Sequence, residues 1–475
     1  MKKTKAVIWS GIEKFSFEFL HLTFGIIMAR ILSPSDYGII GILMVFISFS
    51  NIFVEGGMTT AIIQKKKKHN CDYDTANIYN IAVAIIMYLL IFLISPWFEN
   101  FYHIKDFTLL LRTLSMMLII SSLSAVYYTK LTIEYEFKKI FTTSISSLII
   151  SSGIGIYMAL KGYGVWALVL QQLSTVSIRS ILLITLSKYK NTFVFSTQSF
   201  HELFSFSYKL ILTNIFARVY DNCYPLIVGK LYPLNVLGFY SRGQQFSLMP
   251  ANILNDMFIR VAFPNMSEVQ DDKEKLKECF ILYLKYSSYA IFFIMFLVII
   301  LADPLIRIVL TDKWVKSIPF MQILCIGYMF NTICSLNLNL LFVKGRSDLA
   351  LKVELIKKTT ALIILAISTI WGIWGICIGQ ALYGFIATIQ NTIYTKQYIN
   401  MSYWDEFKIF GQIWIIGLIS ALIPYLVMFL STNLFVKIFI PTILYMMFFA
   451  FIIKIICKRD YENIKKALIN KISKK

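Results

Sequence analysis

Long apolar stretches alternate with short polar segments along the whole chain. A membrane-spanning helix needs roughly 20 mostly apolar residues, and the stretches have about this length. Hydrocarbon offers no partner to backbone N–H and C=O groups, so such segments are expected to be α-helices. The pattern predicts an all-α polytopic membrane protein with fourteen spans, at residues 7–31, 37–61, 76–98, 108–129, 141–160, 164–187, 207–229, 238–262, 280–302, 317–343, 353–371, 373–395, 411–430 and 435–457.

The composition supports a membrane protein and argues against a soluble one. Of the 475 residues, 57% are hydrophobic and 15% are charged, whereas soluble domains have about 45–50% and about 25%. The formal net charge of +20 would suggest a nucleic-acid partner for a soluble protein. Because membrane proteins concentrate Lys and Arg in their cytoplasmic loops, we expect no nucleic-acid partner here.

The basic residues of the loops predict the orientation of the chain. They are concentrated at both ends and in every second loop, for example at Lys65–Lys68 and in the tail that begins at Lys458. By the positive-inside rule, both termini are cytoplasmic, and the protein is expected to be a multi-pass protein of the cell inner membrane. The opposite loops carry fewer basic residues, namely Lys105, Lys161, Lys230, Arg307, Lys313, Lys316 and Lys437.

The two halves of the chain share a sequence pattern. Three matches indicate that six helices repeat as six helices, and an even number gives both halves the same orientation. The halves should therefore be related by an axis along the membrane normal. The matches are Arg30–Gly38 with Lys230–Gly238 (offset 200), Gly164–Leu168 and Gln172 with Gly372–Ile376 and Gln380 (offset 208), and Lys130, Glu134 and Lys138 with Lys344, Asp348 and Lys352 (offset 214).

The repeat and the loops predict the domain organisation. Two parallel six-helix lobes should surround a central cavity, and two further helices should follow them. The predicted parts are an N-terminal lobe at 1–187, a cytoplasmic linker at 188–206, a C-terminal lobe at 207–396, the last two helices at 397–457 and a basic cytoplasmic tail at 458–475.

Ionisable side chains inside the apolar spans are the candidate functional residues, because charges in hydrocarbon are costly. Lys14, Glu18 and His21 lie at i, i+4 and i+7 of the first span, so they share one face of its helix. We expect this polar stripe to face the cavity between the halves. Glu18 or His21 is a candidate to take up a coupling ion, a proton or Na⁺.

The equivalent span of the second half carries a matching stripe, Asn214, Arg218 and Asp221, at the offset of 200 residues. Arg218 lies near the middle of the span, and guanidinium binds phosphate bidentately and stays charged. It is therefore the strongest candidate for binding an anionic substrate, and Asp221 is a further candidate for the coupling ion. The alternative is that Arg218 and Asp221 neutralise each other as a packing pair.

Two arginines, Arg179 and Arg242, are weaker cavity candidates. They lie within a few turns of a helix end, where a long side chain can extend to the interface. Enzyme motifs are absent: the sequence has no HExxH, no P-loop and no GxSxG. No cofactor and no metal site are expected, and transport would have to be driven by a gradient, by membrane potential or by consumption of the substrate.

Several segments resemble those of Wzx-type polysaccharide flippases, in the branch that contains colanic-acid and teichuronic-acid exporters. The resemblance covers nearly the whole chain and is most specific around residues 217–276. It rests on Trp9-Ser10, Ala29–Gly38, Ala217-Arg218, Asp221-Asn222, Leu237–Arg242, Phe263-Pro264, Gln270–Leu276, Lys313-Trp314, Ile318-Pro319 and Leu324-Cys325.

The resemblance implies the fold and the function of the multidrug/oligosaccharidyl-lipid/polysaccharide exporter superfamily. Such a protein would move an undecaprenyl-pyrophosphate-linked oligosaccharide from the cytoplasmic to the periplasmic leaflet by alternating access. This step would serve lipopolysaccharide or exopolysaccharide synthesis beside other polysaccharide assembly proteins. Arg218 is at a position where family members place a cation for the pyrophosphate.

Two other functions stay open at this point. A drug or cation antiporter of the same fold would favour a carboxylate-rich, aromatic cavity. A membrane-bound oligosaccharide polymerase or ligase would favour a long outer loop with catalytic Arg or His. The longest predicted outer loop, 303–316, is short and contains no His.

Overall fold

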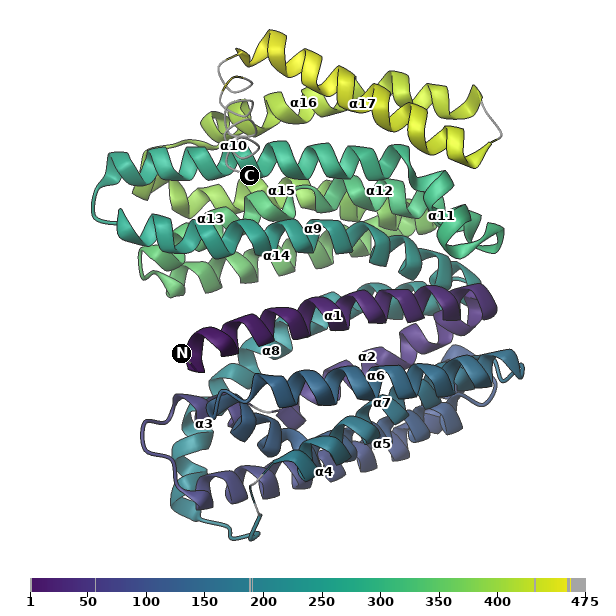
Figure 1. Ribbon diagram of the computed structural model, residues 1–475, viewed down its shortest axis with the longest axis vertical. Coiled ribbons are helices and arrows are strands. Elements are labelled where there is room, and N and C mark those ends of the chain that lie inside the picture. The colour runs from purple at the N-terminus through teal and green to yellow at the C-terminus, as the bar shows by residue number, and fades with distance from the viewer. Residues whose placement is uncertain are drawn as a thin grey trace. The chain divides into compact units, whose positions relative to one another are not determined.

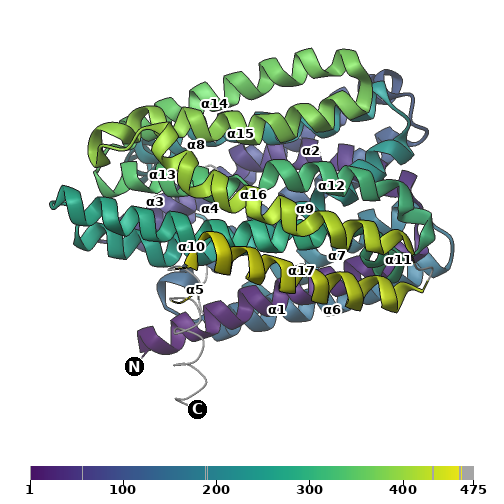
Figure 2. The ribbon, with the colours of Figure 1, turned by 90° about the horizontal axis from the view of Figure 1, so that it is seen from above.

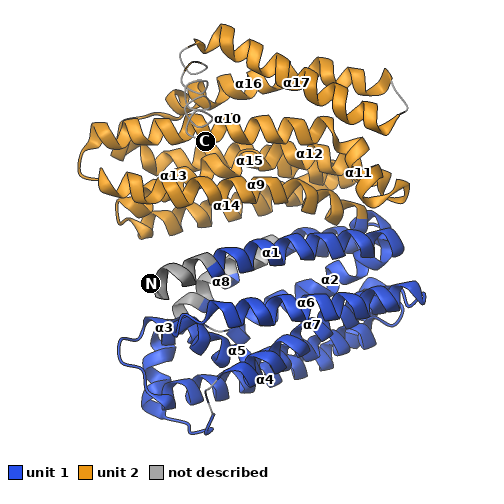
Figure 3. Ribbon diagram, viewed as in Figure 1, with its two compact units in different colours: residues 1–238 blue, residues 239–475 orange. Residues whose placement is uncertain are grey.

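The apolar stretches form α-helices in the computed structural model, and the described part of the chain contains no strand (Figure 1). The structure describes residues 2–55, 57–187, 189, 191–430, 433–458 and 462. Side chains are further left out at residues 2–8, 209, 210, 212–214 and 216–221. The chain divides into two units, residues 1–238 and residues 239–475 (Figure 3).

Unit 1 is built from α-helices that pack along one another. The helix α4 packs on α5, α6 packs on both α7 and α1, and α2 packs on α8. Most of these helices are longer than 20 residues, as a helix that crosses the hydrocarbon layer must be. Their bounds are α1 Lys2–Ile31, α2 Pro34–Glu55, α3 Met58–Gln64, α4 Asn70–Tyr102, α5 Phe107–Ile133, α6 Phe137–Leu160, α7 Val165–Leu186 and α8 Thr197–Leu231.

Unit 2 follows the first turn of α9. The helix α15 packs on α12, α13 and α14, and α16 packs on α10 and lies beside α17 (Figure 2). The bounds are α9 Leu234–Glu268, α10 Lys273–Ile300, α11 Ala302–Leu310, η1 Asp312–Ser317, α12 Ile318–Tyr328, α13 Asn331–Val343, α14 Ser347–Ser368, η2 Thr369–Trp371, α15 Gly372–Ile399, α16 Tyr403–Val427, η3 Met428–Leu430 and α17 Leu434–Ile456.

Both units expose large apolar side chains along their helices. Leu93 on α4 is 74% exposed and Phe451 on α17 is 60% exposed. Apolar surface of this extent needs lipid around it. Among the described residues, ten segments are long and apolar enough to cross a membrane. The protein is therefore a multi-pass helical membrane protein, and the number of fourteen spans stays a prediction.

Several helices begin earlier than predicted, and in α8 and α16 a polar side chain caps the earlier start. The Ser196 side chain accepts a hydrogen bond from the Ser199 N–H and starts α8 at Thr197, within the range 188–206 expected to be a linker. A capping box between Ser402 and Asp405 starts α16 at Tyr403. The domain boundaries themselves stay a prediction.

Polar bonds fasten the segment between α7 and α8 to the start of α4. Tyr189 and Thr192 donate hydrogen bonds to the Asp74 carboxylate, and the Ser196 N–H donates to Thr75 Oγ1 at 3.0 Å. Beside them, Lys65 Nζ forms ion pairs with Asp72 at 2.8 Å and with Glu202 at 2.7 Å. Residues 65–75 and 189–202 therefore lie together at one end of unit 1.

The internal repeat is visible in the backbone. The glycines matched at the offset of 208, Gly164 and Gly372, have the same unusual conformation, with φ/ψ of 53°/−129° and 73°/−164°. The helices α1 and α8 end at Ile31 and Leu231, and α2 and α9 begin at Pro34 and Leu234, which agrees with the offset of 200.

The third match is in a different register from the predicted one. The turn after α5 places Tyr135 at φ 61°, with the Glu136 N–H bonded to Leu131 O. The turn after α13 is the same: Gly345 is at φ 67°, and the Arg346 N–H bonds to Leu341 O. These turns correspond at an offset of 210, not 214. The predicted match used charged residues spaced four apart, and such a pattern matches again after a shift of four residues. The charges alone therefore could not fix the register.

Two glycines bring the repeated segments into backbone contact. A Cβ added at Gly38 would lie 2.1 Å from the Leu234 carbonyl oxygen, and a Cβ added at Gly238 would lie 1.9 Å from the Pro34 carbonyl oxygen. At the offset of 200, Gly38 corresponds to Gly238 and Pro34 corresponds to Leu234. The two contacts are thus equivalent, and each depends on the absence of a side chain.

This contact leads to a first prediction. Gly38→Ala and Gly238→Ala should each destabilise the protein by about 1–3 kcal/mol, because the new methyl group overlaps a carbonyl oxygen and the backbones must separate. Thermal unfolding of the purified protein in detergent measures the effect. The control is Gly153→Ala on α6, where an added Cβ has nothing within 4 Å. Equal unfolding temperatures for all three variants would contradict the prediction.

Candidate functional site

The stripe predicted on the first helix lies on the open side of α1. Lys14, Glu18 and His21 are exposed, while other residues of α1 pack on α6. The His21 ring stacks on Phe17, with centroids 6.0 Å apart. Unit 1 thus leaves the stripe uncovered, and its place in a cavity stays a prediction.

The matching stripe on α8 lies outside the described side chains. Asn214, Arg218 and Asp221 are on a helix whose backbone is described, within α8, but the placement of their side chains is not described. Their assignment to a substrate cavity therefore rests on the sequence.

The two weaker candidates both stack on aromatic rings. The Arg179 guanidinium on α7 lies 5.4 Å from the centre of the Tyr128 ring of α5. The Arg242 guanidinium on α9 lies 5.8 Å from the centre of the Trp314 ring and donates a hydrogen bond to Gln245. Arg242 is 8% exposed and Trp314 is fully buried. These contacts give both arginines a packing role within their own units.

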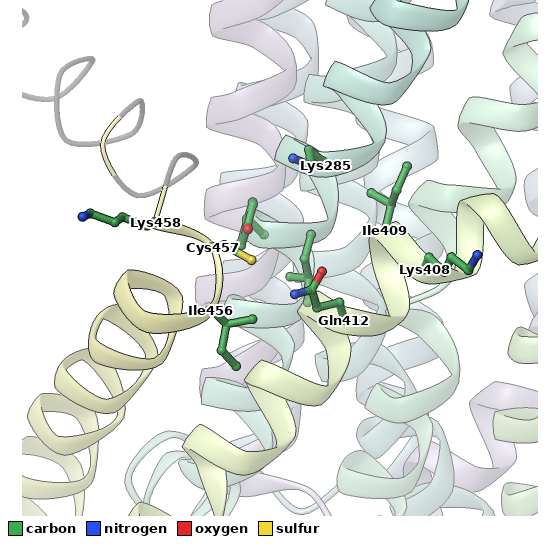
Figure 4. Close-up of a pocket in the computed structure, with 9 residues that line it drawn as sticks. Lys285, Lys408, Ile409, Gln412, Ile456, Cys457 and Lys458 are labelled. Atoms are coloured by element: carbon green, nitrogen blue, oxygen red, sulfur yellow. The ribbon is translucent and has the colours of Figure 1, made fainter.

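The structure contains a cationic pocket of about 450 Å³ in unit 2. It forms where the helices α10 and α16 meet the end of α17, so three segments far apart in sequence contribute to it (Figure 4). Its lining residues are Lys285 and Tyr289 from α10, Lys408, Ile409, Gln412 and Ile413 from α16, and Ile456, Cys457 and Lys458 from the end of α17.

Charged and apolar groups are divided within this pocket. The side chains of Lys408 and Lys458 extend to opposite sides of it, and Gln412 points between them (Figure 4). Isoleucines of α16 and α17 form the apolar part of the wall, and none of the lining residues is acidic. A ligand with an anionic head and an apolar chain matches this division, because lysine stems cover apolar surface while the ammonium groups stay at the rim.

The sequence analysis does not reveal this pocket. Lys408 falls outside the thirteenth span, because that span was predicted to begin at residue 411. The helix α16 begins at Tyr403, which places Lys408 and Gln412 one turn apart on one helix face. The capping signal Ser402-x-x-Asp405 was the feature that could have revealed the earlier start.

Metal chemistry has no candidate centre in the part of the chain described. No group of three or more His, Cys, Asp or Glu side chains is arranged to hold a metal ion there.

Taken together, the long apolar helices and the two units define a multi-pass membrane protein of a transporter fold. The polysaccharide biosynthesis protein family model matches residues 27–319, which is more than half of the chain. The chain belongs to this family.

Curated relatives cover most of the chain. A membrane protein of the cps region of Klebsiella pneumoniae is 24% identical over 80% of this chain and 79% of its own length. The lipopolysaccharide biosynthesis protein WzxC of Escherichia coli K12 is 25% identical over 81% of this chain and 78% of its own length. Both proteins are similar to this chain over lengths that include both units.

Solved structures confirm the fold. The lipid II flippase MurJ in an inward closed conformation superposes with a TM-score of 0.76 at 16% sequence identity, over 94% of this chain and 99% of its own. The predicted membrane transporter architecture is therefore confirmed, and at this identity the likeness concerns the fold alone.

The pocket leads to a second prediction. The double variant Lys285→Gln, Lys408→Gln should bind farnesyl pyrophosphate, an amphiphilic anion, more weakly by roughly tenfold or more, since each lysine near the ligand is worth about 1 kcal/mol. Native mass spectrometry in detergent gives the dissociation constant. Lys275→Gln is the matched control: this lysine lies on α10 outside the pocket and is 69% exposed. Equal losses in control and double variant would mean that the effect is not specific to the pocket.

Proposed function

We propose that this protein is a flippase that moves an undecaprenyl-pyrophosphate-linked oligosaccharide from the cytoplasmic to the periplasmic leaflet of the inner membrane. It is a transporter and not an enzyme. The observation that carries the proposal is the family match over residues 27–319 on a chain folded as a membrane transporter. The description of the family is polysaccharide biosynthesis protein, and the name of WzxC places that relative in lipopolysaccharide biosynthesis.

Physical chemistry explains why such a protein is needed. A lipid pyrophosphate with its sugars would expose charge and hydroxyl groups to hydrocarbon during unaided crossing, at a cost on the order of tens of kcal/mol. A water-filled path with a few cations removes most of this barrier. Arg218 is the cation we assign to the path itself. The pocket of Lys285 and Lys408 supports an earlier step, in which the lipid phosphate is held at the edge of unit 2.

Reconstitution tests this function directly. Purified protein in liposomes should move a fluorescent isoprenyl-pyrophosphate oligosaccharide between leaflets, and a bilayer-impermeant quencher reports the exposed fraction. Protein-free liposomes give the baseline. A drug or cation antiporter of the same fold would instead accumulate a cationic dye and leave the lipid-linked sugar in place.

The third prediction concerns Arg218, which we propose lines the substrate path together with Asn214 and Asp221. If Arg218 binds the pyrophosphate, transport should fall in part for Arg218→Lys, which keeps the charge but loses the bidentate geometry. It should fall further for Arg218→Ala and cease for Arg218→Glu, which repels the phosphates. The quenching assay above measures each variant at matched protein abundance.

A charge swap separates binding from simple pairing. In Arg218→Asp with Asp221→Arg, a packing pair survives and transport should return to the wild-type level. If Arg218 contacts the substrate, the swapped protein stays inactive. Full activity of the swapped protein would remove Arg218 from the substrate path.

The fourth prediction concerns the orientation in the membrane. We propose that both termini are cytoplasmic. In a cysteine-free background, a cysteine placed at the exposed Lys67 should be unreactive toward an impermeant maleimide added to spheroplasts, whereas Asp106→Cys in the turn between α4 and α5 should react. The reverse pattern would show that the protein is inserted the other way.

A further inference from the structure

A buried carboxyl group lies at the end of unit 2 where α15 is connected to α16. Glu406 is in the first turns of α16 and is 1% exposed. The Asn337 Nδ2 of α13 donates a hydrogen bond to its Oε2 at 2.9 Å. Thr395 of α15 in turn donates to Asn337 Oδ1 at 2.7 Å. Asn337 and Thr395 are themselves fully buried.

The second oxygen of this carboxyl group, Oε1, has no hydrogen-bond partner. Among the described residues, no Lys or Arg forms an ion pair with Glu406, and the two side chains that face its carboxyl group, the Asn337 amide and the Thr392 hydroxyl, are both neutral. An ionised carboxylate needs several donors or a cation when it is removed from water. Two neutral side chains and no cation do not meet that need, so the charged form is poorly accommodated here.

The neighbouring hydroxyl of Thr392 suits the neutral form. Thr392 of α15 is the polar side chain that faces the carboxyl group beside Asn337. Its own hydrogen is directed to the Thr388 carbonyl oxygen at 3.0 Å, which leaves its oxygen lone pairs to accept a hydrogen bond. A proton on Oε1 therefore has an acceptor nearby, whereas an ionised Oε1 would have to draw the Thr392 hydrogen away from the Thr388 carbonyl oxygen.

We propose that Glu406 is a proton-binding site, occupied in the state described here, and that it releases and rebinds its proton during the transport cycle. With the proton in place, the chain of bonds runs from Thr395 through Asn337 to Glu406, and from Glu406 through Thr392 to the Thr388 carbonyl. It joins the three helices α13, α15 and α16. Loss of the proton leaves a buried charge, so these helices must separate enough to admit water or a cation.

The titratable and charged groups around the site come from α10, α13, α14 and α16. On α16 itself, Asp405 is one residue away and adds a like charge, while Tyr403 presents a phenol. The α13 thiol of Cys334 interacts with the carboxyl group. From α14, the pair Glu354–Lys357 acts on Cys334, and the cations Lys408 of α16 and Lys277 of α10 act on Asp405. No charged group of α15 or α17 acts on Glu406 in the described structure.

The site differs from the coupling residues predicted from the sequence, Glu18, His21 and Asp221. Those belong to the stripes on α1 and α8, whereas Glu406 belongs to one of the two helices outside the six-helix repeat. The occurrence of the proton site does not depend on the cargo. Its link to the transport cycle rests on the proposed flippase function.

Infrared spectroscopy of the purified, substrate-free protein tests the site, and this fifth prediction has a matched control. The wild type at neutral pH should show the carbonyl band of a protonated carboxylic acid, shifted in deuterium oxide and lost at alkaline pH. Glu406→Gln should lack the band, and its amide should keep the bonds to Asn337 and Thr392, so the variant should fold. Glu354→Gln, which removes a half-exposed carboxylate of the same unit, should retain it.

Thermal unfolding gives a second readout. A proton that the folded protein holds and the unfolded chain releases makes the wild type less stable as the pH rises. Glu406→Gln should lose this part of the pH dependence, and Glu354→Gln should keep it.

In the infrared experiment, a carbonyl band that is absent at neutral pH, or that survives in Glu406→Gln, would overturn the site. Loss of the band on adding Na⁺ but not K⁺ at constant pH would also overturn it, in favour of a Na⁺ site.

Transport in liposomes tests the link to the cycle. Flipping by the wild type should change severalfold with an imposed pH gradient, and flipping by Glu406→Gln should not respond to it. A Glu406→Gln protein that still follows the gradient would overturn the link and leave the site intact. If the wild type moves no lipid-linked sugar, the proposed flippase function fails, while the infrared result stands by itself.

Discussion

Two glycines that face two carbonyl oxygens set how closely the repeated segments of this protein can approach. In a membrane, helices gain little from the hydrophobic effect when they associate, since lipid is as apolar as a leucine side chain. Close backbone approach then supplies the attraction, through dispersion and through Cα–H···O contacts of roughly 0.5–1 kcal/mol each. Gly38 and Gly238 permit this approach at two equivalent places, so the entry of α2 and the entry of α9 are positioned together.

One segment that resembles polysaccharide flippases, Leu237–Arg242, contributes Tyr240 to the packing inside unit 2. Tyr240 donates a hydrogen bond to Gln380 at 2.7 Å, Gln380 donates to Tyr328 at 2.7 Å, and Gln244 donates to the same phenol at 2.9 Å. In hydrocarbon such polar side chains bond to one another across helices, because no water is present to bond to them. A characteristic motif in this family can therefore identify the fold without marking the place where the substrate binds.

The fold was predictable from the sequence because each span has to satisfy one strong physical condition. Long apolar runs must be helical in lipid, and conformationally special residues such as Gly164 and Gly372 end and begin helices at matched places. Helix starts were harder to predict. The first turns of α8 and α16 are polar enough to resemble loops, and a single hydroxyl cap decides where each of them begins.

The candidate sites were less predictable than the fold, because some of their residues lie in helix starts that resemble loops. Glu406 lies in the first turn of α16, three residues after the helix begins at Tyr403 and before the predicted start of the span at residue 411. Its hydrogen bonding depends on Asn337 and Thr395, which come from distant segments of the chain. Arg242, in contrast, was recognised as a charge near a helix end, but its position over Trp314 depends on a tertiary contact. A pattern along one helix indicates which residues share a face, and only the packed structure shows what covers that face.

The hydrogen bonds of the segment before α8 carry a topological consequence. Asp74 at the start of α4 is bonded to Tyr189 and Thr192, and Lys65 is paired with Glu202. Residues bonded to one another must lie on the same side of the bilayer. The chain between them contains the four helices α4 to α7, and a return to the starting side requires an even number of crossings. This parity condition holds whichever way the protein is inserted, and it excludes any topology in which just one of these four helices fails to cross.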